Sequence, residues 1–301
     1  MKKNYLIFIS FLIGVFIWSG IYLPKSFQLE EEKLFLIEKG QSLFQISQYL
    51  EKEGLIKNRF FFNLYVILKG SQKKLQAGKY YFKPSENIAK IAKKIISGDT
   101  AKIIVTIPEG FTQKQIEEQL GIKLPGENLE GFLFPDTYQF PIDVTGEEVV
   151  KKMRENFDKK FAPYRNEVSG AGLTPFEIVT MASLIEKEAR GKEDKEIVSG
   201  ILWKRMENNI PLQVDSTITY ITDKKTTKIS KEETQIDSPY NTYKYLGLPP
   251  GPICNPGLES ILAALYPESS QYWYYLSTPE GKIIFSKTLE EHNLAKVKYL
   301  K

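Results

Sequence analysis

The segment "TPFEIVTMASLIEKEARG", residues 174–191, predicts a helix with clear ends and a cluster of charges in its last turn. Thr174 supplies a hydroxyl cap, Pro175 occupies the first helical position, and Glu177 lies three residues after the cap. This combination is typical of a helix start. Gly191 is the expected stop, because glycine commonly follows the last helical residue.

One glutamate of this segment lies on the apolar side of the predicted helix. A helical residue turns by about 100°, so an apolar stripe can be placed on a helical wheel. The stripe comprises Ile178, Ala182, Ile185 and Ala189. Relative to Ala182, Glu186 lies at about +40°, inside the apolar arc, whereas Glu188 lies near about −120° on the polar flank. We therefore expect Glu186 to be shielded and Glu188 and Arg190 to be solvated.

Two interpretations of Glu186 are open. It can form an ordinary i,i+4 pair with Arg190 at the edge of the helix, worth a few tenths of a kcal/mol. Alternatively, it is a carboxylic acid kept protonated by partial desolvation, since burial raises the pKa of a glutamate above its usual value of about 4.3. A protonated carboxyl is what a glycosidase uses to protonate the leaving oxygen.

Composition favours carboxylate chemistry. The 301 residues include one cysteine, Cys254, and one histidine, His292, so neither an intrachain disulfide nor a Cys/His zinc site can form. We expect no metal and no cofactor. The formal net charge is +4, and only five of the 41 basic residues are arginine. Nucleic acid is therefore not an expected partner.

The N-terminus predicts a membrane anchor. Residues 5–23 are apolar, and no charged residue occurs between Lys3 and Lys25, a length that can cross a bilayer. A cleaved signal peptide is the alternative, but residues 18–22 make a poor cleavage site. Lys2 and Lys3 favour a cytoplasmic N-terminus. We expect a single-pass protein of the cell membrane, whose remaining residues lie outside the cytoplasm.

A weak internal repeat follows the anchor. "IEKGQSLFQISQYL" (37–50) aligns without gaps on "IPEGFTQKQIEEQL" (107–120), and each copy predicts a strand end, a glycine turn, a hydroxyl cap and a helix. Residues 82–98 repeat the turn and helix, with Ser85 as the expected cap. These units predict a small α+β module over about residues 32–103. The alternative is that any strand–turn–helix unit shows this pattern.

Further elements predict a mixed α+β fold for the rest of the chain. We expect helices over residues 147–161 and 195–208, and a loop or short strand over the aromatic, proline-containing residues 131–141. Residues near 273–286 predict a hairpin that turns at Pro279–Gly281.

Two polar segments are candidate ligand-binding sequences. "PLQVDST" (211–217) and "SPYNTY" (238–243) combine amides, hydroxyls and aromatic rings, which suit sugar rings. Turns are rich in the same residues, so a structural role is the alternative, for Asp215 in particular. The candidate substrate-binding residues are Gln213, Asp215, Ser216, Thr217, Tyr240, Asn241, Tyr243 and Asn255.

These segments, in this order, resemble the endolytic murein transglycosylases of the YceG-like family, which are membrane-anchored peptidoglycan lyases. The matching stretches are "LEGFLFPDTYQF" (129–140), "ASLIEKEA" (182–189), "PLQVDST" (211–217), "SPYNTYKYLGLPPGPICNPG" (238–257) and "FSKTLEEHN" (285–293). The chain departs from the family's usual pattern at Ser216, where a proline is expected, at residues 203–206, and at Ile283 and Ile284.

The resemblance implies three parts: an anchor over residues 1–30, a LysM-like module over 31–104 and a catalytic domain over 105–301. It also implies cleavage of the MurNAc-β-1,4-GlcNAc bond in nascent glycan strands, which leaves 1,6-anhydro ends and terminates elongation. The family's catalytic glutamate is placed on Glu186, and His292 is expected to be structural. Peptidoglycan strands are the implied substrate, and peptidoglycan synthases are implied partners.

Two alternatives compete with this function. The first is a non-catalytic, membrane-tethered peptidoglycan-binding scaffold, in which Glu186 only forms a salt bridge. The second is a hydrolase that uses Cys254 and His292, although Cys254 lies in a loop without a nearby base in the sequence.

Overall fold

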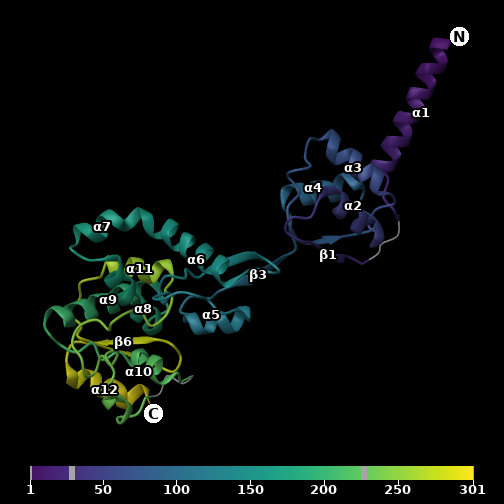
Figure 1. Cartoon of the computed structure of the whole chain (residues 1–301). Coiled ribbons are helices and arrows are strands. Elements are labelled where there is room, and N and C mark those ends of the chain that lie inside the picture. The colour runs from purple at the N-terminus through teal and green to yellow at the C-terminus, as the bar shows by residue number, and fades with distance from the viewer. Residues whose placement is uncertain (1, 27–30, 225–228, 301) are drawn as a thin grey trace. The chain divides into compact units, whose positions relative to one another are not determined.

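The computed structural model describes residues 2–26, 31–224 and 229–300, and the predicted boundary at residue 30 lies outside them. The described chain forms two compact units (Figure 1). The first comprises residues 1–104 with 139–144, and the second comprises 105–138 with 145–301. Both contain helices and short strands, so the predicted mixed α+β class is confirmed.

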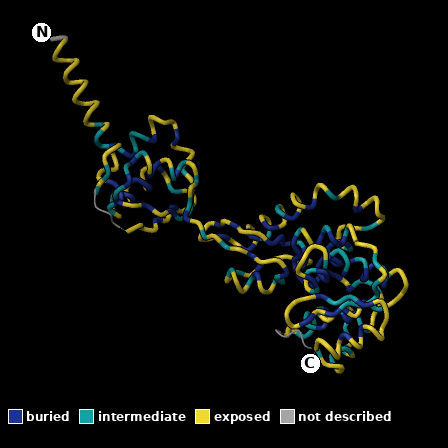
Figure 2. Tube along the Cα trace, turned by 180° about the vertical axis from the view of Figure 1, so that it is seen from behind, coloured by how far each residue is buried: buried dark blue, intermediate teal, exposed yellow. Residues whose placement is uncertain are grey.

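The chain begins with the long apolar helix α1 (Lys2–Tyr22). Residues Asn4–Tyr22 are long and apolar enough to cross a membrane, and 6% of that stretch is buried within the protein. Figure 2 shows the exposed course of this helix.

The remainder of the first unit is a strand–helix–helix–strand–helix arrangement. Its elements are β1 (Lys33–Ile37), α2 (Leu43–Lys52), α3 (Arg59–Leu68), β2 (Gly78–Phe82) and α4 (Ile88–Ser97). β1 and β2 pair antiparallel, with Leu34 opposite Tyr81. Ser42 is the expected hydroxyl cap of α2 and forms a capping box with Gln45, but Asn87, not Ser85, caps α4. The prediction for Ser85 is wrong because the helix starts later and the Asn87 carboxamide accepts from Lys90 N at 2.9 Å.

The second unit starts with a repeat of the same local pattern. The strands β3 (Lys102–Thr106) and β4 (Thr137–Pro141) each contribute residues to both units. The first helices of the second unit are α5 (Gln113–Leu120), α6 (Gly146–Phe161), a 3-10 turn (Ala162–Tyr164) and α7 (Arg165–Gly170). Thr112 caps α5 and Thr145 caps α6, each through a capping box. The aromatic segment near residue 137 is therefore a strand, which pairs with β3.

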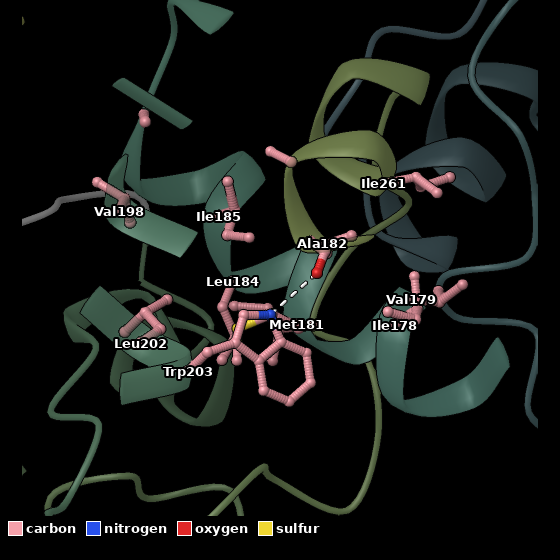
Figure 3. Close-up of a cluster of buried hydrophobic side chains, with 14 of the residues drawn as sticks. Ile178, Val179, Met181, Ala182, Leu184, Ile185, Val198, Leu202, Trp203 and Ile261 are labelled. Atoms are coloured by element: carbon pink, nitrogen blue, oxygen red, sulfur yellow. Dashed lines mark hydrogen bonds between the residues drawn. The ribbon is translucent and has the colours of Figure 1, made fainter. Parts of the chain in front are cut away.

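Helix α8 (Pro175–Glu188) lies at the centre of the second unit's core. Thr174 caps it as predicted, but the helix ends at Glu188, before Gly191, because Ala189 is already extended. Helices α9 (Lys192–Glu207) and α11 (Leu258–Leu265) pack against it. Figure 3 shows this core and the hydrogen bond that Trp203 Nε1 donates to Ala264 O, 2.9 Å.

The remaining elements are α10 (Asp215–Thr222), a 3-10 turn (Glu233–Gln235), β5 (Tyr274–Ser277), β6 (Ile283–Ser286) and α12 (Leu289–Tyr299). Of these, α10 and β5 lie at the end of α8, and α12 packs on the β5–β6 pair. β5 and β6 form the predicted hairpin, with Tyr275 opposite Phe285. Figure 1 shows β6, α10 and α12 grouped at one end of the second unit.

A close contact between α9 and the loop after α11 gives a test of this packing. A Cβ added to Gly200 would lie 1.9 Å from Glu268 O, whereas one added to Gly170 would meet nothing within 4 Å. We expect Gly200→Ala to lower the free energy of unfolding by about 1–3 kcal/mol through steric overlap. Gly170→Ala, the matched control, should be neutral or slightly stabilising. Chemical denaturation measures both, and equal effects would contradict the packing.

Candidate active site

The last turn of α8 places two glutamates in different surroundings. Glu186 and Glu188 are two residues apart, so their side chains point in directions about 160° apart around the helix. Each carboxylate is shielded, but by different parts of the chain. The expectation that Glu188 is solvated is wrong, because elements distant in the sequence cover it.

Glu186 is held by three groups that all contact Oε2. Ser260 Oγ donates to it at 2.6 Å, Gly257 N donates at 3.0 Å, and Lys195 Nζ lies 3.5 Å away. The Lys195 side chain is 3% exposed and that of Glu186 is 9% exposed. The wheel's expectation that Glu186 is shielded is therefore confirmed. Its partner is Lys195 of α9 in place of the neighbouring Arg190, so a buried ion pair joins two core helices.

A further carboxylate approaches this ion pair. Glu109 lies so close to Gly257 that a Cβ on that glycine would be 1.9 Å from Glu109 Oε1. Partial burial and the negative charge of Glu186 raise the pKa of Glu109, while Lys195 acts in the opposite direction. Gly257 therefore allows the loop after β3, the ion pair and the start of α11 to come together.

Glu188 lies in the surroundings expected of a proton donor. Burial and, to a smaller extent, the nearby charge of Asp215 raise its pKa to about 7. The hydroxyl groups of Ser216 and Tyr275 lie close to the carboxyl and offset part of this rise. A carboxyl with a pKa of about 7 is protonated in about half of the molecules at pH 7, so it can both give and take a proton.

Asp215 and Tyr243 connect the two polar segments that the sequence singled out. The Tyr243 hydroxyl donates a hydrogen bond to Asp215 Oδ1. Loss of solvent raises the pKa of Asp215, and this hydrogen bond acts against the rise. Gln213 N donates to Thr242 O at 3.0 Å, which aligns the segments beside each other. The structure thus brings "PLQVDST" and "SPYNTY" together next to Glu188.

The side chains of Ser216 and Gln213 differ in exposure. The Ser216 Oγ is buried and makes no well-formed hydrogen bond within the described residues, although it lies beside Glu188. Gln213 is exposed and adopts a left-handed backbone conformation, with φ of 53°. Asp215, two residues after Gln213, is the first residue of α10, where the helix dipole favours a negative charge.

The other predicted binding residues have contacts within the protein. Thr217 Oγ1 donates to Val214 O at 2.8 Å and is fully buried. Asn241 Nδ2 donates to two backbone carbonyls, and its Oδ1 accepts from Tyr243 N at 2.9 Å. Asn255 Oδ1 accepts from Leu133 N at 2.8 Å. The Tyr240 ring packs 5.2 Å from that of Tyr220. Their roles as ligands to a substrate stay predictions.

The sequence interpretation did not identify Tyr275, which lies beside Glu188, or Arg205, which lies near Tyr275. Tyr275 belongs to β5 and faces Glu188, and its burial raises its pKa well above the usual value. Arg205 of α9 donates to Leu212 O at 2.8 Å and to Trp273 O at 2.9 Å, and its guanidinium lies 5.1 Å from the Tyr274 ring. Arg205 therefore links the segment before Asp215 to the strand that carries Tyr275. Strand alternation places Tyr275 on one face, but no local signal connects it with α8.

The cysteine and the histidine have structural surroundings. Cys254 is fully buried, its Sγ donates to Ser183 O at 3.3 Å, and burial raises its pKa. A thiol in this state is a poor nucleophile, which opposes the Cys–His hydrolase alternative. His292 stacks on Tyr274 with ring centroids 5.3 Å apart, and burial lowers its pKa to about 4.

Known proteins match this chain over most of its length. The model of the YceG-like family matches residues 35–298. The chain belongs to the YceG-like family. It is 34% identical to an endolytic murein transglycosylase of Bacillus subtilis, over 88% of this chain and 84% of that protein. It is 30% identical to one of Streptococcus pneumoniae, over 85% of this chain and 56% of that longer protein.

A crystal structure of a putative YceG-like protein from Listeria monocytogenes has the same fold. It is 34% identical to this YceG-like chain, with a TM-score of 0.60 over 89% of this chain and 100% of that one. These matches cover both glutamates of α8.

The Glu186–Lys195 pair gives a stability test. Glu186→Gln keeps the size of the side chain but leaves Lys195 as a buried, unpaired charge, so we expect the free energy of unfolding to fall by about 3 kcal/mol. Glu196→Gln is the matched control, because Glu196 forms a partly exposed pair with Lys192 at 3.8 Å. Its loss should change stability by less than about 0.5 kcal/mol. Similar values for the two variants in urea denaturation would show that the buried pair is not a structural link.

Proposed function

We propose that this chain is an endolytic lytic transglycosylase that cleaves the MurNAc-β-1,4-GlcNAc bond within nascent peptidoglycan strands and leaves 1,6-anhydro-MurNAc ends. The relatives named as endolytic murein transglycosylases support the reaction class. The single observation that carries the mechanism is the Glu188 carboxyl, whose pKa is raised to about 7 beside Asp215, Ser216 and Tyr275.

One carboxyl suffices for this reaction. Protonated Glu188 donates its proton to the glycosidic oxygen while the bond from that oxygen to C1 of MurNAc breaks. The Glu188 carboxylate then accepts the proton of the MurNAc C6 hydroxyl while the oxygen of that hydroxyl bonds to C1. No water enters, and Glu188 ends protonated again. The negative charge of Asp215 would stabilise positive charge developing at C1.

We assign the acid to Glu188 in preference to Glu186 because of what each carboxylate contacts. Oε2 of Glu186 is already the acceptor for Ser260, Gly257 and Lys195, so it is engaged in holding α8, α9 and α11 together. Glu188 lies instead among side chains from both polar segments. Among the predicted ligands, we propose that Gln213, Asp215, Ser216 and Tyr243 contact the glycan. Thr217, Asn241 and Asn255 then shape the surrounding loops.

Matched glutamine variants of the two glutamates test this assignment. Glu188→Gln cannot donate a proton, so the formation of anhydro ends from purified glycan strands should fall by at least about 100-fold while the fold is kept. Glu186→Gln should retain activity within about tenfold at a temperature where it remains folded. Mass spectrometry of the products measures both. The reverse result would place catalysis on Glu186, and a wild-type protein that makes no anhydro ends would support the scaffold alternative.

The pH dependence gives an independent test. The acid must be protonated before bond cleavage, so we expect kcat/KM to fall about tenfold per pH unit above about pH 7. The pKa of Glu188 is raised on folding, from 4.5 to about 7, so the native state binds more protons between these values. Its contribution to the free energy of unfolding therefore decreases as pH rises from about 4.5 to about 7.

Glu130 provides the control for this pH test. Burial raises its pKa also to about 7, but it accepts from Gln113 N and Asn255 Nδ2, away from the Glu188 group. Glu130→Gln should alter the pH dependence of stability and leave the pH profile of kcat/KM unchanged. A shifted activity profile in this variant would contradict the assignment to Glu188.

The remaining parts of the proposal concern location and partners. The exposed apolar helix α1 supports a single-pass anchor with the N-terminus in the cytoplasm and the catalytic domain outside it. The strand–helix–helix–strand arrangement of residues 33–82 supports a LysM-like module that contacts glycan. Action on nascent strands would place the protein beside peptidoglycan synthases.

A further inference from the structure

Helix α3 of the first unit has apolar side chains on its outer surface as well as its inner one. Its sequence, "RFFFNLYVIL", buries Phe62 and Val66 in the unit's core. Yet Phe60 is 57% exposed, Ile67 45% and Leu68 71%. A water-facing helix normally carries polar residues at such positions. The outer surface of α3 therefore resembles that of α1 more than that of α4.

The same helix packs directly against α1. The ring of Phe61 lies edge-on to that of Phe16, with centroids 5.4 Å apart. A Cβ on Gly20 would lie 2.5 Å from the Phe61 ring, so the absence of a side chain there lets α3 approach the helix closely. Ile17 and Ile21 join the apolar core of the first unit. The end of α1 is thus fixed to α3, as Figure 1 shows.

This contact sets the depth of α3 relative to the apolar span. The span ends at Tyr22, and Phe16 precedes it by six residues. At 1.5 Å per residue, Phe16 lies about 9 Å back along the axis. If residues 4–22 cross the bilayer, Phe61 lies at a level below its surface. Polar residues of α3 at that level would be costly, and after Arg59 at its start the exposed residues of the helix are Phe60, Ile67 and Leu68.

The flanks of α3 have the groups expected at a lipid surface. Lys57 precedes the helix, Arg59 is its first residue and Lys69 follows it, and all three are exposed. Long basic side chains extend from an apolar surface toward lipid phosphates. Trp18 and Tyr22 stack at the end of α1, with ring centroids 5.9 Å apart. Such aromatic residues are enriched at the membrane–water interface.

We infer that α3 lies in the outer-leaflet interface of the membrane, with Phe60, Ile67 and Leu68 among the lipids, and so docks the first unit on the bilayer. This inference rests on the proposed anchoring by α1. The partner is the lipid bilayer itself, because the apolar surface of α3 is continuous with that of the span. Docking would fix the first unit at the membrane rather than leave it on a free tether.

Site-specific fluorescence tests this placement in the full chain. Single cysteines replace Phe60, Leu68, Phe11 or Leu36 in a Cys254→Ala background, and each carries a nitrobenzoxadiazole label in vesicles of phosphatidylcholine and phosphatidylglycerol. Phe11 reports on α1, and Leu36, 50% exposed on β1, is the matched apolar control. Formation of anhydro ends by each labelled protein checks its fold.

We expect the labels at positions 60 and 68 to be quenched at least twofold by spin-labelled lipid and shielded from iodide, as at position 11. The label at position 36 should show the opposite. If spin-labelled lipid quenches the label at position 11 but iodide reaches the labels at positions 60 and 68, the docking of α3 is wrong and the anchoring by α1 stands. Shielding from iodide without lipid quenching would mean that protein covers α3, which also overturns it. A label at 11 exposed to iodide would refute the anchor and the docking together.

Discussion

The ion pair between Glu186 and Lys195 is the contact on which the second unit's geometry depends. It crosses from α8 to α9, and the same Oε2 accepts hydrogen bonds from Ser260 and Gly257 at the start of α11. An unpaired buried charge is far more costly than a satisfied one. Helices α8, α9 and α11 must therefore stay packed so that Glu186 keeps its three partners. These contacts fix the last turn of α8 in one orientation.

That orientation determines the environment of Glu188. With Glu186 directed at α9 and α11, Glu188 points toward α10 and the β5–β6 hairpin, where Asp215, Ser216 and Tyr275 surround it. Desolvation raises its pKa, and Asp215 adds to the effect. Two glutamates of one helical turn thus acquire separate roles, one holding helices and one holding a proton, because the protein surrounds them differently.

The two units share local patterns but differ in what covers them. Capping boxes at Ser42 and Thr112 start similar helices, α2 and α5. In the first unit, the apolar surface of α3 continues that of α1, whereas in the second unit the core around α8 is closed by helices and the hairpin. The exposed apolar side chains of α3 are therefore the feature that a bilayer would cover.

The sequence by itself determined the features that depend on near neighbours. The start of α8 at Thr174, the hairpin turn near Gly281 and the apolar span of α1 follow from caps, turn residues and composition, so they were predictable. The shielding of Glu186 also followed from helical periodicity. The tertiary structure alone decided that Lys195 is its partner and that Glu188 is covered. Ser216 and Tyr275 reach Glu188 from distant parts of the chain. A helical wheel compares only residues of one helix, so it could not predict these contacts.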